Sequence, residues 1–264
     1  MTTYKILFLD IDGTILTPDD RIEESTKEAI AEVQKKEIEV FLATGRPLHE
    51  ISQIAEELNI HSFIGYNGAY AVHNGVDVLK EPMNAEIVES SIEIAKEFNH
   101  DIVFYTSEQN LFTTLESPAV KEFIKRFHLH NNDLYSPKVV NDILGMTIIN
   151  IEENDPRHYE KDENIHLSQV NVEGLTHNYD VIRDSVNKGF AVSKVLELLN
   201  IGKESAIAFG DGMNDKEMLM LVGEGFAMGN AHPDLFAYAK HKTTEVTNSG
   251  VYNGLKSLGV INGN

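Results

Sequence analysis

The sequence predicts an α/β fold: a Rossmann-like parallel-sheet core with helices on both faces, plus an inserted α+β cap domain. Two observations predict it. Short apolar runs without polar alternation, typical of strands buried on both faces, alternate with amphipathic helical segments near both ends of the chain. In the middle of the chain the expected strands are paired and closer together. We therefore expect a first core segment at 1–82, a cap at 83–182 and a second core segment at 183–264.

The first core segment alternates between strand and helix and then closes with a hairpin. Pro47 suits the first turn of a helix, and Asn74-Gly75 suits the tight turn of a hairpin. This order is typical of a parallel sheet with right-handed connections. The expected elements are strands 5–9, 38–43 and 62–66, helices 22–36 and 47–58, and the hairpin 70–79.

The pattern changes after Pro82 and returns near the end of the chain. Paired strands in the middle indicate an antiparallel sheet, while the last segment again alternates between strand and helix. For the middle we expect helices 84–98, 120–127 and 153–162, and strands 101–105, 111–115, 146–151, 165–172 and 179–182. For the last segment we expect helices 187–200, 213–222, 233–239 and 250–258, and strands 205–210 and 225–228.

Composition indicates a globular protein and restricts its partners. The 264 residues are 42% hydrophobic, yet no window approaches ~18 uninterrupted apolar residues, the length that spans a membrane. The 42 acidic and 22 basic residues give a net charge of −20, which repels nucleic acid and anionic membranes. The absence of cysteine excludes disulfides and thiol chemistry. With no signal-peptide pattern at the N-terminus, we expect a cytoplasmic protein.

Two carboxylates follow the first strand directly. These are Asp10 and Asp12, and Gly13 provides the freedom for the bend that brings both to one site. In open α/β sheets, ligands bind at the carboxyl ends of the strands. Such a pair can ligate Mg²⁺ through hard oxygen atoms, and a carboxylate can also attack phosphorus to form an aspartyl-phosphate. The alternative without chemistry is an Asp-Gly turn that merely follows a strand.

A second apolar strand ends in acids in the same way. Asp211 follows strand 205–210, and Asp215 lies in the first turn of the next helix. If the two strands are neighbours, Asp10, Asp12 and Asp211 converge and supply part of a Mg²⁺ coordination shell. Asp215 has a plainer explanation as well, because acidic side chains are favoured at helix N-termini.

A phosphate site in so acidic a chain needs local hydrogen-bond donors and a cation. Lys188 begins a helix, against the usual dipole preference, and is the best candidate to hold a phosphate beside the attacking carboxylate. Thr44 and Gly45 lie in a strand-to-helix turn whose backbone N–H groups and hydroxyl can hold a phosphate. The alternatives are a solvated surface lysine and a simple helix cap.

Taken in chain order, the four short motifs that contain these residues resemble the four motifs of the haloacid dehalogenase-like phosphohydrolases, and more narrowly of their Cof-type branch. There the cap is inserted between the second and third motifs, and the long stretch between Thr44 and Lys188 leaves room for it. The resemblance covers the whole chain. The motifs that carry it are Asp10-Ile-Asp12-Gly-Thr14, Thr44-Gly45-Arg46, Lys188-Gly189 and Gly210-Asp211-Gly-Met-Asn214-Asp215.

The resemblance implies a role for each of these residues. Asp10 attacks phosphorus, and Asp12 acts as general acid and then as general base. Asp10 and Asp211 ligate Mg²⁺ through their side chains and Asp12 through its backbone carbonyl, while Asp215 is a ligand or supports the site. Lys188 stabilises the charge of the phosphoryl group. The residues expected to bind phosphate or substrate are Thr44, Gly45, Arg46, Asn67 and Asn214.

Arg46 and Asn67 both follow strand tips of the core, where they can face the substrate or the cap. Each has a plainer alternative: a surface salt bridge for Arg46, and an Asx-type turn for Asn67.

The predicted function is a Mg²⁺-dependent phosphatase that hydrolyses small phosphate monoesters, such as sugar phosphates or phosphorylated cofactors, through an aspartyl-phosphate. A phosphomutase of the same superfamily is the runner-up, since it shares the covalent intermediate. A non-catalytic sensor that binds a phosphorylated metabolite is a third possibility, which the full set of acids and the lysine disfavours. We expect a small phosphorylated metabolite as partner, no nucleic acid, no membrane, and a monomer or homodimer.

Overall fold

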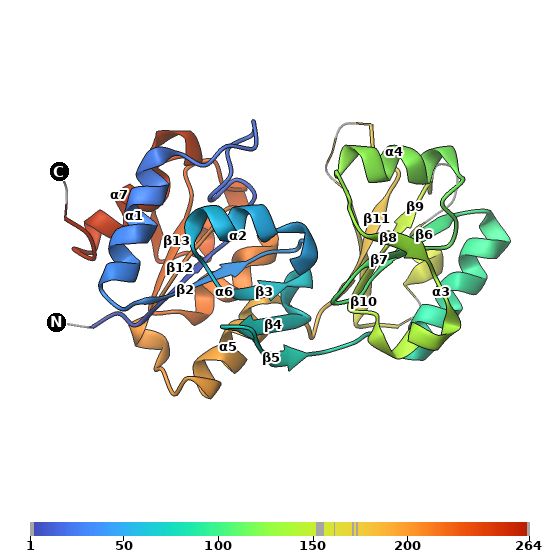
Figure 1. Ribbon diagram of the computed structural model, residues 1–264, viewed down its shortest axis with the longest axis horizontal. Helices are drawn as coiled ribbons and strands as arrows, with labels where there is room; N and C mark the ends of the chain where they lie inside the picture. Colours follow the sequence, from blue (N-terminus) through green and yellow to red (C-terminus); the bar gives the residue numbers. More distant parts are fainter. Residues whose placement is uncertain (1–2, 152–155, 161, 171, 173, 263–264) are drawn as a thin grey trace. The chain divides into compact units, whose positions relative to one another are not determined.

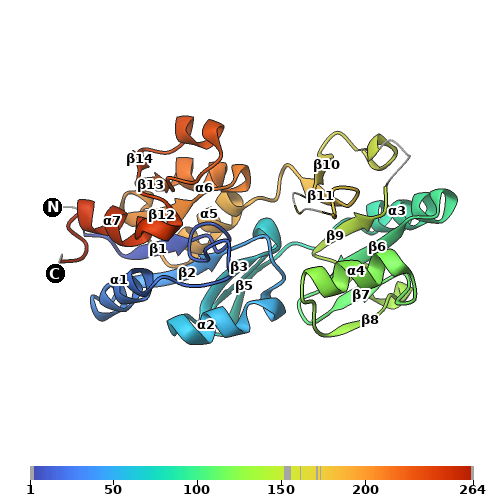
Figure 2. The ribbon, with the colours of Figure 1, turned by 90° about the horizontal axis from the view of Figure 1, so that it is seen from above.

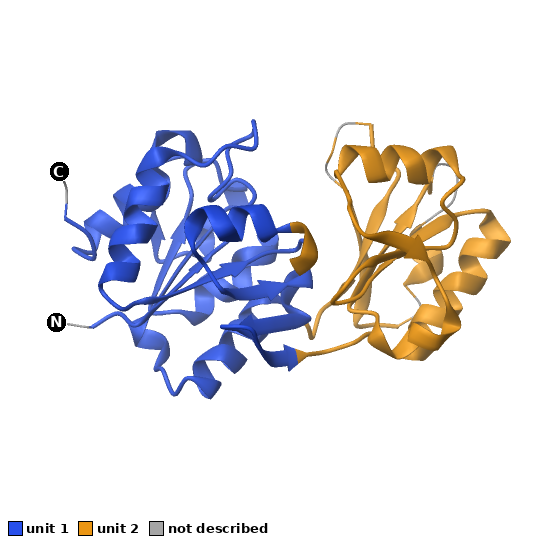
Figure 3. Ribbon diagram, in the orientation of Figure 1, with its two compact units in different colours: residues 1–46, 51–79, 187–264 blue, residues 47–50, 80–186 orange. Residues whose placement is uncertain are grey.

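A computed structural model describes residues 3–151, 156–160, 162–170, 172 and 174–262. The chain divides into two compact units, each with its own sheet (Figures 1 and 3). Unit 1 comprises residues 1–46, 51–79 and 187–264, and unit 2 comprises residues 47–50 and 80–186. No helix among the described residues is both long enough and apolar enough to cross a bilayer.

Unit 1 is built on a sheet of eight strands in the order β14-β13-β12-β1-β2-β3-β4-β5. The six strands from β14 to β3 run parallel, and β4 pairs antiparallel with β3. The order confirms a Rossmann-like core in which segments from both ends of the chain share one sheet. The strands are β1 Ile6–Leu9, β2 Glu39–Ala43, β3 Ser62–Gly65, β4 Tyr70–His73, β5 Val76–Lys80, β12 Ala206–Gly210, β13 Glu224–Ala227 and β14 His241–Lys242.

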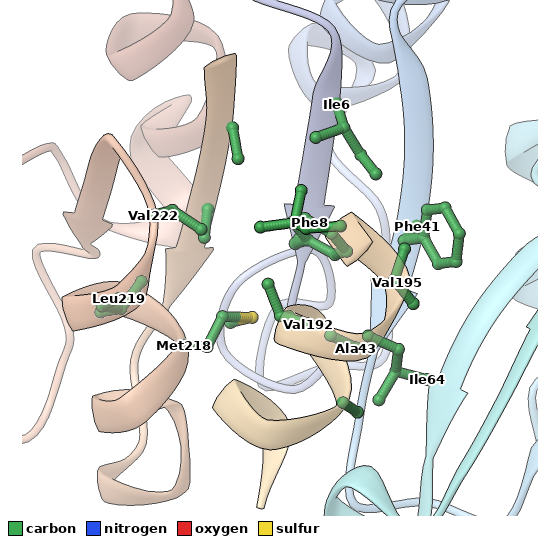
Figure 4. Packing of buried hydrophobic residues seen from close by; sticks show 14 of the residues in the cluster. Ile6, Phe8, Phe41, Ala43, Ile64, Val192, Val195, Met218, Leu219 and Val222 are labelled. Carbon is green, nitrogen blue, oxygen red and sulfur yellow. The ribbon is translucent and has the colours of Figure 1, made fainter. Parts of the chain in front are cut away.

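Helices cover both faces of this sheet, because the central strands are apolar on both sides. Ile6 and Phe8 of β1 pack under α5 and α6 in one buried cluster (Figure 4). The opposite face carries α7, whose Gly254 lies against the ring of Phe209. Figure 2 shows α1 and α2 on the side away from α5 and α6. The helices are α1 Glu24–Lys35, α2 Ser52–Leu58, α5 Lys188–Leu198, α6 Lys216–Leu221 and α7 Gly250–Ser257.

Unit 2 has the α+β character expected of the middle of the chain. Its six strands follow the order β10-β11-β9-β6-β7-β8, all antiparallel except the β7–β8 pair. Ile102 and Phe104 pack with α3, whereas Val103 between them packs with α4, so the two helices cover opposite faces. The elements are α3 Ala85–Phe98, α4 Pro118–Arg126, β6 Asp101–Tyr105, β7 Asn110–Phe112, β8 Asn132–Leu134, β9 Gly145–Ile149, β10 Ile165–Gln169 and β11 Tyr179–Arg183.

Several predicted elements differ from the structure. The helix expected from Pro47 is a 3₁₀ turn, Leu48–Glu50, followed by α2, and the helix expected at 213–222 likewise begins as a 3₁₀ turn. Strands β8 and β14, with three and two residues, were not predicted because such short runs carry no periodic signal. The helix expected at 153–162 lies partly outside the described residues, and its described part contains the 3₁₀ turn Pro156–Tyr159.

Candidate active site

The carboxyl ends of β1, β2 and β12 lie at the same edge of the unit 1 sheet. Leu9, the last residue of β1, is in register with Leu42 of β2 and Phe209 of β12. Asp10 therefore leaves the sheet beside the turns that begin with Thr44 and Asp211. Parallel pairing brings three motifs that are far apart in the sequence to one edge, which is where ligands bind in such sheets.

Lys188 lies at the centre of a buried group of charges. Its ammonium group donates to Oδ1 of Asp10 at 2.5 Å and to Oδ1 of Asp215 at 2.6 Å. The side chain of Lys188 is fully buried although it begins α5, and the two carboxylates compensate for a cation at the positive end of the helix dipole. The next residue, Gly189, must lack a side chain. Helix α5 approaches α6 so closely there that a Cβ at position 189 would lie 2.6 Å from the backbone carbonyl carbon of Glu217.

Asp215 shapes the turn that carries Asp211. Its second oxygen, Oδ2, accepts hydrogen bonds from the backbone N–H groups of Asp211 at 2.9 Å and of Gly212 at 3.0 Å. Both of its oxygens are thus engaged, one by Lys188 and one by the turn. Asp215 is fully buried, so these contacts fix its orientation as well as that of the turn.

Asp211 is held against the turn that follows β1. The hydroxyl of Thr14 donates to Asp211 Oδ1 at 3.3 Å. A Cβ on Gly13 would lie only 2.2 Å from Asp211 Oδ2, and the φ of Gly13 is +79°. Glycine is therefore required at position 13 both for its backbone conformation and for space.

Positive charge is in deficit in this buried group. Burial, followed by the charge of Asp215, holds the pKa of Asp10 well above its usual range. The same two causes raise the pKa of Asp211 to about 6. Burial lowers the pKa of Lys188, but the charges of Asp10 and Asp215 outweigh it and the net change is upward. One ammonium group among three carboxylates therefore favours a further cation.

The three carboxylates form a donor set that can bind a divalent metal ion. One oxygen each from Asp10, Asp211 and Asp215 lie within 4.8 Å of one another. Carboxylate oxygens are the ligands that hard cations such as Mg²⁺ prefer. Asp215 is the least available of the three, because both its oxygens already accept hydrogen bonds. The side chain of Asp12 is not one of this set and contacts Arg46 instead.

The contact between Arg46 and Asp12 uses two atoms of each residue. Nε donates to Oδ2 at 2.9 Å, and Nη2 donates to Oδ1 at 2.5 Å. Burial lowers the pKa of Arg46, but its hydrogen bond to Asp12 and the charge of that carboxylate produce a net rise. The structure thus joins two predicted site residues whose contact no sequence pattern predicts.

The other predicted phosphate-binding residues lie on neighbouring turns. Asn214 Nδ2 donates to Asn67 Oδ1 at 3.0 Å, which joins the turn after β12 to the turn after β3. A Cβ on Gly45 would lie 3.0 Å from Asn67 Oδ1, so these residues are in contact as well. Thr44 is buried, and its hydroxyl oxygen accepts a hydrogen bond from the N–H of Arg46 at 3.0 Å. The O–H of Thr44 still has its proton to donate.

Sequence reasoning missed one residue that supports the site. The side-chain amide of Asn230 donates to the carbonyl of Gly13 at 2.8 Å and accepts from the N–H of Val246, also at 2.8 Å. Asn230 thus ties the turn between Asp12 and Thr14 to the loop after β13. The only available signal was an Asn shortly after a buried strand, which is common in ordinary loops.

Known proteins resemble this chain over nearly its whole length. A family model for haloacid dehalogenase-like hydrolases matches residues 7–255. "Putative phosphatase YkrA" of Bacillus subtilis (strain 168) is 33% identical over 97% of this chain and 98% of its own length.

Two solved structures are similar over nearly all of this chain. A hypothetical protein of Geobacillus kaustophilus HTA426 has a TM-score of 0.88 and 30% identity, with 98% of this chain and all of that chain covered. The sugar phosphatase BT4131, described as a member of subclass IIB of the same superfamily, has a TM-score of 0.82 and 25% identity, with 97% and 100% covered. The chain therefore belongs to the haloacid dehalogenase-like hydrolases and is an enzyme of their phosphatase branch.

Proposed function

We propose that this enzyme is a Mg²⁺-dependent phosphatase that hydrolyses small phosphate monoesters through an aspartyl-phosphate. The observation that carries the proposal is the buried contact of Lys188 with Asp10 and Asp215 at the strand ends, close to Asp211. A nucleophilic carboxylate held by a cation, beside further oxygen donors for a metal, is what attack on a phosphate dianion requires.

The chemistry divides into two half-reactions. In the first, Asp10 attacks phosphorus and Asp12 donates a proton to the leaving oxygen. In the second, Asp12 takes a proton from water, which attacks the phosphorylated Asp10. Lys188 and the turn at Thr44 and Gly45 supply donors for the phosphoryl oxygens. Asn214 and Asn67, which contact each other at 3.0 Å, position that turn and the substrate.

The residues fit a divalent cation of the hard type. Asp10 and Asp211 would hold it through carboxylate oxygens and Asp12 through its backbone carbonyl. Asp215 would orient Lys188 and the Asp211 turn rather than contribute a ligand, since both its oxygens are engaged. When bound, Mg²⁺ offsets the repulsion between the Asp10 carboxylate and the phosphate and polarises a phosphoryl oxygen.

We further propose that the substrates are small phosphorylated metabolites such as sugar phosphates or phosphorylated cofactors. The similarity to a structure named as a sugar phosphatase supports this class. Unit 2 is proposed as the cap, with domain limits near 82 and 182, and as the source of substrate selectivity. A cytoplasmic location and a monomeric or homodimeric state stay predictions, as does the absence of nucleic-acid and membrane partners.

The test is phosphate release from p-nitrophenyl phosphate, measured with Mg²⁺ and with EDTA. Release should require the metal and should disappear in Asp10→Asn, while the exposed Asp19→Asn serves as the matched control. Normal turnover by Asp10→Asn would exclude Asp10 as nucleophile. If the wild type releases no phosphate but transfers it between positions of a sugar bisphosphate, the enzyme is a mutase. Binding of Mg²⁺ and phosphate esters without any turnover would favour the sensor.

A further inference from the structure

Arg46 fixes the direction in which the carboxylate of Asp12 points. The guanidinium group donates from Nε to Oδ2 at 2.9 Å and from Nη2 to Oδ1 at 2.5 Å. A planar fork that meets both oxygens of a carboxylate defines its orientation as well as its position. A lysine, which is a point charge on a flexible stem, would not do this.

The carboxylate of Asp12 is more exposed than that of its neighbour Asp10. Asp10 is 6% exposed and lies in the buried group around Lys188. The side chain of Asp12 is 56% exposed and precedes the turn at Gly13. Within the described part of the chain, Arg46 is the sole side chain in a hydrogen bond with the Asp12 carboxylate. Without it, that carboxylate would sample several rotamers.

The backbone of Arg46 is anchored on both sides. Its N–H donates to the hydroxyl of Thr44 at 3.0 Å, and its carbonyl accepts from the N–H of Tyr66 at 3.2 Å. The side chain makes a half-exposed, two-point ion pair with Asp12. A fixed backbone that aims a planar fork at the carboxylate proposed as acid and base points to a role in the reaction.

The contact matches one half-reaction better than the other. Both Asp12 oxygens accept one hydrogen bond from Arg46. A carboxylate has about four lone-pair sites, so each oxygen retains one that can accept from water. The second half-reaction needs an Asp12 oxygen that accepts from water, whereas the first needs the same group to donate a proton to the leaving oxygen. The geometry therefore serves the attack of water.

We propose that Arg46 is a positioning residue that holds Asp12 as the base for hydrolysis of the phosphorylated enzyme, an inference that rests on the proposed phosphatase function. In this step the Asp12 carboxylate takes a proton from water, and the water oxygen bonds to the phosphorus on Asp10. The bond between phosphorus and the Asp10 oxygen breaks, its electron pair returns to the Asp10 carboxylate, and inorganic phosphate leaves. Asp12 then holds the proton.

Rapid mixing of the Mg²⁺-loaded enzyme with p-nitrophenyl phosphate separates the two half-reactions. The nitrophenolate leaves in the first and phosphate in the second. For Arg46→Ala we expect a burst of nitrophenolate equal to the enzyme concentration, followed by slow turnover, and phosphorylated enzyme in the intact mass after acid quench. Misplacement of a reacting group by about 1 Å can cost about 100-fold, so hydrolysis of the phosphoenzyme should slow roughly 10- to 100-fold.

Matched variants separate positioning from a loss of charge or of phosphate binding. Arg21→Ala removes an exposed arginine and should behave as wild type. Arg46→Lys keeps the charge without the fork and should recover only part of the rate. Asp12→Asn should slow hydrolysis of the phosphoenzyme, and adding Arg46→Ala to it should slow that step no further, because Arg46 acts through Asp12.

Two results would overturn the inference. One is a rise in KM, or slower formation of the phosphoenzyme, with its hydrolysis unchanged; Arg46 would then contact the substrate phosphate directly. The other is a further loss in the double variant. Failure of the proposed function is a separate result: no phosphoenzyme would form in any variant, and Asp10→Asn would turn over normally.

Discussion

Lys188 donates a hydrogen bond across 2.5 Å to Asp10, a residue 178 positions earlier in the chain, and the lysine side chain is fully buried. The same ammonium group contacts Asp215 at 2.6 Å, so a single cation serves two carboxylates. Removing one partner of a buried ion pair leaves the other charge uncompensated. This destabilises the fold more than replacing both partners with apolar residues would. Folding and the proposed chemistry therefore depend on the same atom.

Lys188→Met keeps most of the apolar stem and removes the charge. We expect the free energy of unfolding to fall by about 3–5 kcal/mol, the usual cost of orphaning a buried charge, and turnover to be lost. Urea denaturation and steady-state kinetics measure both effects. Lys194→Met is the control: Lys194 lies on the same helix, pairs with Glu197 at 3.3 Å on the surface, and should cost ~0–1 kcal/mol. Equal losses in the two variants would contradict the prediction.

Gly13→Ala should damage the site more than the backbone conformation alone explains. Gly13 and Gly75 share a φ of +79°, but a Cβ at Gly75 has nothing within 4 Å, whereas one at Gly13 meets Asp211 at 2.2 Å. Gly75→Ala should therefore cost only the left-handed conformation, about 1–2 kcal/mol. Gly13→Ala should lose the same amount of free energy of unfolding, and it should also displace the side chain of Asp211. Calorimetric titration with Mg²⁺ should show weakened binding in Gly13→Ala alone, and equal affinities would refute the argument.

Asp215→Asn tests whether this residue supports the metal site or belongs to it. The substitution preserves size but places an amide N–H group opposite Lys188. If Asp215 only orients its neighbours, Mg²⁺ affinity should fall by roughly 10- to 100-fold, as for other outer-shell partners. Asp211→Asn should reduce the affinity much further, because it removes the negative charge of a proposed direct ligand. Equal losses by calorimetric titration would instead make Asp215 a ligand.

His100 should make unit 2 less stable on acidification. Burial, and then the charge of His158, lower the pKa of His100, whose Nδ1 lies 2.8 Å from the hydroxyl of Tyr159. Below about pH 6.5 the unfolded chain binds a proton before the folded one does, so the free energy of unfolding falls as pH falls through this range. Above about pH 6.5 both states are neutral and this contribution to the pH dependence is absent.

The corresponding measurement is the urea midpoint of wild type and His100→Gln between about pH 7.5 and pH 5.5. The midpoint should decline less steeply in the variant. Parallel slopes for wild type and His100→Gln would assign the pH dependence to other groups.

The sequence predicted the core because its strands are apolar on both faces and end abruptly in acids. The strand patterns placed Asp10 and Asp211 at strand tips, and parallel pairing then required those tips to share an edge. Register alone could not predict that Arg46 reaches Asp12, since that contact depends on rotamers and on the path of the chain after Thr44. The support from Asn230 was hidden for the same reason: its partner, Gly13, is 217 positions away.

Short elements were beyond sequence reasoning on physical grounds. Strand β14 has two residues and β8 has three, so neither displays a period. The helix expected after Pro47 fits the rule for helix starts, yet the chain forms a 3₁₀ turn before α2. The reason lies in tertiary contacts, because Glu50 and His49 both hydrogen-bond to Asn110. Local propensity is overridden where a segment packs against a distant part of the chain.

Pro47–Glu50 belongs to unit 2 although the residues on either side belong to unit 1, so the chain crosses between the units after residues 46, 50, 79 and 186. Glu50 accepts from the side chain of Asn110 at 2.8 Å and from the N–H of His130 at 2.9 Å, and Asn110 is fully buried. Recombination that exchanges unit 2 between relatives as one continuous block would leave this tetrapeptide behind and remove an acceptor from a buried amide. A functional chimera must therefore transplant two pieces of sequence, and the second has only four residues.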